Sequence, residues 1–150
     1  MEESFAIEQK AKYELQLRLI ESGTKLSDLN LSKERHAKSY AVINPSGESI
    51  RTEDFTTENQ SITPRSIAHL KLSGTMMSED GLCSRGVGHL VTAIRAINAN
   101  PSVDGILIEC NTGGGEGTAG TLLNSAIQDS KKPVVVWAHF LASAGIKGTL

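Results

Sequence analysis

The sequence lacks several features that mark particular protein classes. It has only two cysteines, Cys83 and Cys110, too few for the disulfide framework of a small secreted domain. Neither has the neighbours of a zinc motif, so we predict no metal and no other cofactor. Cys110 lies in an apolar run and is expected in the core. Aromatic residues make up only 4% of the chain, which indicates an aliphatic core.

The chain also lacks a basic excess and a long apolar run. Its 17 acidic and 15 basic residues give a net charge of −2, whereas a nucleic-acid binder that neutralises phosphates needs a basic surplus. No run approaches the ~18 apolar residues of a membrane-spanning helix, and the acidic segment 1–5 is not a secretory signal. We therefore expect no nucleic-acid partner, no membrane anchor, and a location in the cytoplasm or inside an assembling particle.

The composition divides the chain into two parts at the polar segment 56–61. Residues 1–60 are polar and charge-rich, and we interpret them as an N-terminal extension. Within it, residues 2–21 carry apolar side chains at four-residue steps, which predicts a helix, with a strand as the alternative. Residues 39–51 predict a β-hairpin around the Pro45-Ser46-Gly47 turn.

Residues 61–150 alternate short apolar runs with amphipathic segments. This order predicts βαβ units, with a mostly parallel sheet and helices packed outside it. The last two strands are nearly continuous apolar runs, which is typical of strands buried on both faces. The expected strands are 67–72, 105–110 and 133–137, and the expected helices are 87–97, 119–127 and one starting at Ala142.

Two segments follow strands, where α/β sheets gather their ligands. Residues 111–117 contain three consecutive glycines, whose backbone N–H groups can approach an anion such as a phosphate or an oxyanion. The segment lacks the features of a phosphate-binding P-loop or a dinucleotide motif, and a tight turn is the alternative. Residues 138–145 place Ser143 among small residues at an expected helix start. There it is either an exposed reactive hydroxyl or an ordinary N-cap.

In combination, three segments resemble the signal peptide peptidase A family of Ser-Lys serine peptidases. They are residues 108–114, residues 132–136 and the Leu141-Ala-Ser-Ala-Gly145 run. Residues 67–78 and 99–105 are similar to that family's first core strand and helix-to-strand passage. The polar extension is more like the phage and prophage branch, whose members act as head-maturation proteases.

The resemblance implies an α/β fold with a ClpP/crotonase-like core. It implies Ser143 as the nucleophile and the backbone amides of Gly113 and Gly114 as the oxyanion hole. A neutral lysine takes the serine proton in this family. The implied substrate is a peptide or protein, such as a capsid scaffold or capsid precursor, and the implied assembly is a homo-oligomer within the cytoplasm or a procapsid.

The chain departs from the family pattern at three points, one of which is Ala138-His139 where many members have Asn-Gly. Asn111-Thr112 replaces the usual Ser-Pro before the paired glycines. The family's lysine lies several tens of residues beyond the serine, so we expect a core truncated at its C-terminus and inactive by itself. Lys147, one helical turn after Ser143, and His139, with no evident carboxylate partner, are weak candidates for the base. A non-catalytic assembly protein and a crotonase-like acyl-CoA enzyme remain the alternatives.

Overall fold

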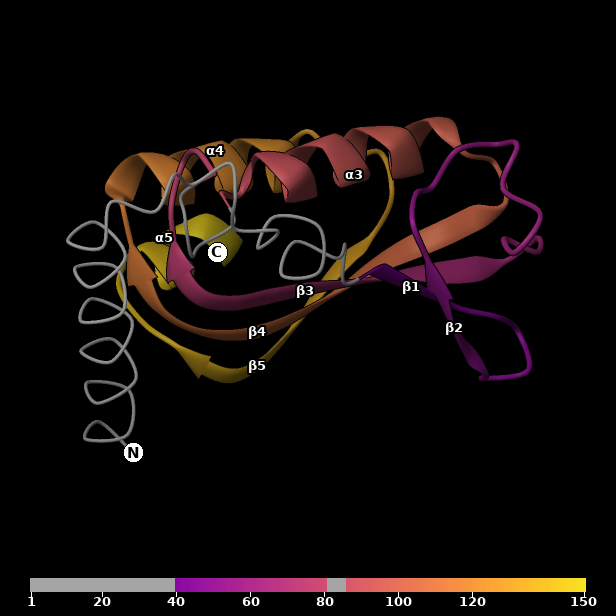
Figure 1. Ribbon diagram of the computed structural model, residues 1–150, viewed down its shortest axis with the longest axis horizontal. Coiled ribbons are helices and arrows are strands. Elements are labelled where there is room, and N and C mark those ends of the chain that lie inside the picture. The colour runs from indigo at the N-terminus through magenta and orange to yellow at the C-terminus, as the bar shows by residue number, and fades with distance from the viewer. Residues whose placement is uncertain (1–39, 81–85) are drawn as a thin grey trace, which may run out of the picture. The chain divides into compact units, whose positions relative to one another are not determined.

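The computed structural model describes residues 40–80 and 86–150, which belong to a compact unit from Lys38 to Leu150. The helix expected over residues 2–21 lies outside the described residues. In the described part, five strands form one sheet in the order β2-β1-β3-β4-β5, together with three helices (Figure 1). The predicted α/β class is therefore confirmed.

The predicted hairpin is present. Strands β1 (Tyr40–Ile43) and β2 (Ser49–Thr52) pair antiparallel. The Asn44 side chain shapes their turn, because its Oδ1 accepts hydrogen bonds from the backbone N–H groups of Ser46, at 3.1 Å, and Glu48, at 2.9 Å. Strand β1 also pairs antiparallel with β3, so the hairpin extends the same sheet that carries the core strands.

The three core strands run parallel, as predicted. They are β3 (Ser66–Met76), β4 (Val103–Gly115) and β5 (Val134–Leu141), and the helices are α3 (Gly88–Ala99), α4 (Gly117–Gln128) and α5 (Ala144–Thr149). Each strand is longer than predicted. The glycines expected in a loop continue β4, where Gly114 pairs with Thr75 of β3 beyond an irregularity in register. Cross-strand pairing there outweighs the low strand propensity of glycine.

Helices α3 and α4 lie side by side over one face of the core strands (Figure 1). The predicted apolar stripe of α3 is completely buried at Leu90, Ile94 and Ile97. Burial of each such side chain stabilises the fold by about 1.5–3 kcal/mol. Cys110 of β4 is also buried, and burial, with a smaller effect from the charge of Glu109, raises the pKa of its thiol to about 11. Cys110 is therefore a core residue, as predicted.

The opposite face of the sheet carries no helix within the described residues (Figure 1). Val135 and Trp137 of β5 point to this face and are 61% and 53% exposed. The prediction that residues 133–137 are buried on both faces was wrong. Successive side chains of a strand point to opposite faces, and the described helices cover only the face that Val134 and Val136 share.

Candidate active site

The carboxyl ends of β4 and β5 are neighbours in the sheet. Thr112 of β4 pairs with Leu141 of β5, and the Ala142 N–H donates a hydrogen bond of 3.2 Å to the Thr112 carbonyl. Parallel pairing thus brings together the two segments that the sequence analysis selected, residues 111–117 and 138–145. Helices α4 and α5 begin at the same end of the sheet.

Ser143 forms the turn between β5 and α5 and has an unusual backbone conformation. Its φ is 48° and its ψ is −121°, a combination that few non-glycine residues adopt. Such a conformation costs of order 1–3 kcal/mol and occurs most often at functional sites. Within the described residues, the Ser143 side chain makes no capping hydrogen bond to α5, and the residue is exposed. These observations weigh against an ordinary N-cap.

Gly114 packs directly against this serine turn. A β-carbon placed on Gly114 would lie 2.8 Å from Cβ of Ser143, 2.7 Å from the Ala142 carbonyl oxygen and 2.9 Å from the Ala144 nitrogen. The φ of Gly114, +93°, also favours glycine. The glycine-rich end of β4 therefore contacts Ser143 because it lacks a side chain at this point.

The Gly114 amide has a hydrogen-bond acceptor in this arrangement. It donates to Oγ1 of Thr112 at 3.0 Å, and the Thr112 hydroxyl donates to the Gly74 carbonyl of β3 at 2.5 Å. Thr112 is only 1% exposed. The predicted oxyanion donor Gly114 is thus held by a buried hydroxyl, while its neighbour Gly113 is partly exposed in β4.

Two further residues at this end of the sheet were missed by the sequence analysis. The amide of Ala144 directly follows the serine and belongs to the first turn of α5, whose N–H groups have no acceptor within the helix. Glu116 follows the glycines, and its carboxylate accepts hydrogen bonds from the N–H, at 2.8 Å, and the hydroxyl of Ser78. These bonds, led by the one from the hydroxyl, lower the pKa of Glu116.

The two weak candidates for the base occupy different positions. Lys147 is exposed on α5, and its backbone N–H donates to the Ser143 carbonyl at 3.2 Å. His139 lies on β5, where its Nε2 is 3.1 Å from Oε1 of Glu109. The expectation that His139 has no evident carboxylate partner was therefore wrong. Glu109 is 30 residues away in the chain, and only the pairing of β4 with β5 brings it close.

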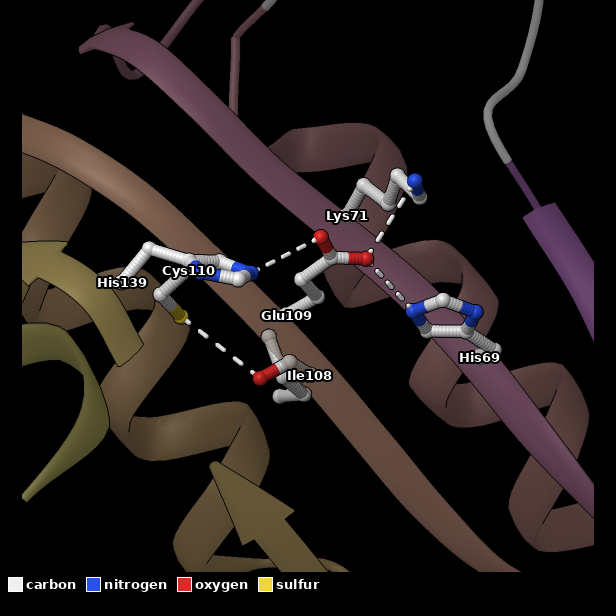
Figure 2. A network of polar contacts seen from close by, with 6 residues as sticks. All are labelled: His69, Lys71, Ile108, Glu109, Cys110 and His139. Atoms are coloured by element: carbon white, nitrogen blue, oxygen red, sulfur yellow. Dashed lines mark hydrogen bonds and ion pairs between the residues drawn. The ribbon is translucent and has the colours of Figure 1, made fainter. Parts of the chain in front are cut away.

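Glu109 is the centre of a polar network on the face of the sheet opposite to the helices. Its Oε2 lies 2.9 Å from Nε2 of His69 and 3.2 Å from Nζ of Lys71, and His139 approaches the other oxygen (Figure 2). Burial alone raises the pKa of Glu109, but the hydrogen bonds from Lys71, His139 and His69 and the lysine charge outweigh it, so the pKa is lowered. Among the described residues, no group of three or more His, Cys, Asp or Glu side chains is arranged to hold a metal ion.

The lysine with a perturbed pKa lies at the other end of the sheet. Burial lowers the pKa of Lys132, an effect that the charge of Asp104 partly offsets. Its Nζ donates to the carbonyls of Asn100 and Val103, at the amino end of β4. Because Ser143 follows the carboxyl end of β5, the length of a strand separates it from Lys132. Lys132 therefore has a structural role, joining the helix-to-strand passage to the start of β5.

No protein-family model matches this chain, and no curated protein matches it. None of the helices in the described ranges is long and apolar enough to cross a bilayer. The fold defines the class as an α/β protein with parallel core strands. Its candidate site is a serine at a strained strand-to-helix turn, in contact with the glycine-rich end of the neighbouring strand.

Proposed function

We propose that this chain is the core of a serine-type peptidase with a ClpP/crotonase-like fold and Ser143 as its nucleophile. The observation that carries the proposal is the strained backbone of Ser143 where it contacts Gly114. A sharp turn between a strand and a helix, with the serine in a strained conformation, exposes the hydroxyl at the end of a sheet in serine hydrolases. The resemblance of the surrounding segments to the signal peptide peptidase A family supports the same assignment.

The proposed reaction passes through an acyl-enzyme. A general base takes the proton from Oγ of Ser143 while Oγ forms a bond to the substrate carbonyl carbon. The oxyanion accepts hydrogen bonds from backbone amides of Gly113 and Gly114, joined by the Ala144 amide on the other side of the serine. The C–N bond then breaks, the amine leaves with the proton from the base, and water hydrolyses the serine ester.

The general base of the proposal is a lysine, as the resemblance implies. The family pattern places it several tens of residues after the serine, and the described alternatives fit less well. His139 is engaged by Glu109 on the outer face of the sheet, and Lys132 is bound to carbonyls at the opposite strand ends. Lys147 follows Ser143 by one helical turn on an exposed helix surface. Reading the gene downstream of codon 150 tests this part of the proposal directly.

The substrate class that we propose is a protein, with capsid scaffold or capsid precursor as the specific expectation, cleaved inside a procapsid by a homo-oligomer. This part rests on the resemblance to the phage and prophage branch alone. A non-catalytic assembly protein is the second candidate, favoured by the exposed apolar side chains of Val135, Trp137 and Phe140 on one face of the sheet.

Labelling by a fluorophosphonate probe tests the nucleophile in the full gene product. The probe forms a phosphorus–oxygen bond to an activated serine and releases fluoride, so labelling should disappear in Ser143→Ala. The exposed Ser125 of α4 provides the matched control, and Ser125→Ala should be labelled like the wild type. Cleavage of a capsid scaffold protein should follow the same pattern. Equal labelling or cleavage by Ser143→Ala and wild type would remove Ser143 from the mechanism.

A further inference from the structure

The side chain of Thr112 links the two halves of the candidate site. Its hydroxyl accepts a hydrogen bond from the Gly114 N–H at 3.0 Å and donates one to the Gly74 carbonyl at 2.5 Å. On the other side of the residue, its methyl group faces the first turn of helix α5, since a β-carbon placed on Gly145 would lie 2.8 Å from Cγ2 of Thr112. Thr112 thus touches the glycine end of β4, strand β3 and helix α5 from a buried position.

We infer that Thr112 is a positioning residue for the oxyanion donors, a role that rests on the proposed peptidase function. The Gly113–Gly115 segment has no side chains to hold its peptide groups, and the φ of Gly114 is +93°. Pairing with β3 holds the strand in place, but the Gly114 N–H itself donates to the Thr112 hydroxyl. Oxyanion stabilisation needs donors that are already oriented before the charge develops. The Thr112 hydroxyl supplies this orientation by holding the Gly114 N–H.

The bond to Thr112 is compatible with a donor role for the same amide. A neutral hydroxyl is a weaker acceptor than a charged oxyanion, and one N–H can be shared between two acceptors. The oxyanion can therefore share the Gly114 N–H with the Thr112 hydroxyl. The uncharged substrate carbonyl of the ground state gains little from this hydrogen bond. A proline at this position, as in the related family pattern, has no hydroxyl for this bond, so the positioning device belongs to the sequence of this chain.

Two substitutions separate the hydroxyl from the methyl group. Thr112→Val keeps the branched shape and removes the hydroxyl, and Thr112→Ser keeps the hydroxyl and removes the methyl group beside Gly145. In the full gene product, Thr112→Val should lower kcat roughly tenfold or more with KM within about twofold, because the interaction acts in the transition state. Thr112→Ser should retain at least about half of kcat. Equal kcat in the two variants, or a change confined to KM, would overturn the inference.

Amide hydrogen exchange gives a readout that does not depend on activity. In Thr112→Val, the Gly114 N–H loses its acceptor and should exchange roughly tenfold faster than in the wild type, whereas Thr112→Ser should match the wild type. Exchange of core amides in α3 should be unchanged in both, which excludes general unfolding. If Ser143→Ala cleaves the substrate like the wild type, the proposed function fails. If the Gly114 amide exchanges at the wild-type rate in Thr112→Val, Thr112 does not hold this amide, whatever the outcome for Ser143.

Discussion

The carboxylate of Glu116 accepts hydrogen bonds from both the N–H and the hydroxyl of Ser78, 38 residues earlier in the chain. The backbone N–H of Glu116 also donates to the Met76 carbonyl at 2.9 Å. These three bonds fix the start of α4 to the end of β3. The glycine segment Gly113–Gly115 is therefore held at its C-terminal end by Glu116 and at its N-terminal end by Thr112.

Replacing Glu116 with alanine should loosen the end of β3. The pKa of Glu116 is lowered by the bonds from Ser78, so the carboxylate is charged at neutral pH and its bonds are lost only as the pH falls through that lowered value. At pH 7 the Ser78 amide should exchange faster in Glu116→Ala than in the wild type. The exposed Glu58 gives the control, and Glu58→Ala should leave Ser78 unchanged. Identical exchange in both variants would contradict the anchor.

Gly114 and Gly117 form a matched pair for testing the contact with Ser143. A β-carbon at position 114 would clash with the serine turn and demand a strained φ, whereas none of the described atoms lies within 4 Å of a β-carbon at position 117, in the first turn of α4. Gly114→Ala should lose about 2–4 kcal/mol of stability and activity with it. Gly117→Ala should be neutral or slightly stabilising. Chemical denaturation measures the free energy of unfolding of both variants. A Gly114→Ala variant as stable as the wild type would disprove the close contact.

The strained backbone at Ser143 predicts an unusual order of stabilities. Ser143→Ala and Ser143→Gly both remove the nucleophile, but only glycine adopts a φ of 48° together with a ψ of −121° without strain. Relief of strain should exceed the entropic cost of glycine in the unfolded chain, so Ser143→Gly should be more stable than Ser143→Ala by about 1 kcal/mol. Thermal unfolding of the two inactive variants measures this difference. The reverse order would show that the turn is unstrained.

The Glu109 network predicts a loss of stability in acid. Because the pKa of Glu109 is lowered in the folded state, its contribution is complete above the unfolded value of about 4.3 and is lost as the pH falls through the folded value. Glu109→Gln should therefore flatten the fall in unfolding free energy as the pH decreases below about 5. Glu58→Gln, at an exposed position, should keep the wild-type slope. Parallel curves for wild type and Glu109→Gln would argue against the network.

The sequence predicted the elements whose cause is local. Apolar side chains at the three- and four-residue spacing of one helix face located α3, and the Pro45-Ser46-Gly47 turn located the hairpin. The glycines at 113–115 were expected in a loop because their own preference is against strand, but pairing with β3 extends β4 through them. Partners far apart in the chain were also missed: Ser78 with Glu116 and His139 with Glu109 meet only after the strands align.

The closeness of the two segments at the candidate site could be predicted, whereas the hydrogen bonds within it could not. Parallel strands must end at a common edge, so Ser143 and the glycines could be expected as neighbours. The strained φ of Ser143 has no signal in a single sequence, because serine is ordinary at a helix start. The role of the Thr112 hydroxyl was also hidden, since its two partners belong to β3 and to the backbone of the glycine segment.

The close approach of Gly115 to β3 affects how a mutational scan of this protein should be interpreted. A β-carbon at Gly115 would lie 2.1 Å from the Met76 carbonyl oxygen, far closer than a non-bonded carbon and oxygen can approach. Every side chain introduced there would force two strands apart, whatever its chemistry. Inactive clones at codon 115 would therefore report crowding, and only inactive clones that remain folded, as expected at codon 143, would report a chemical role.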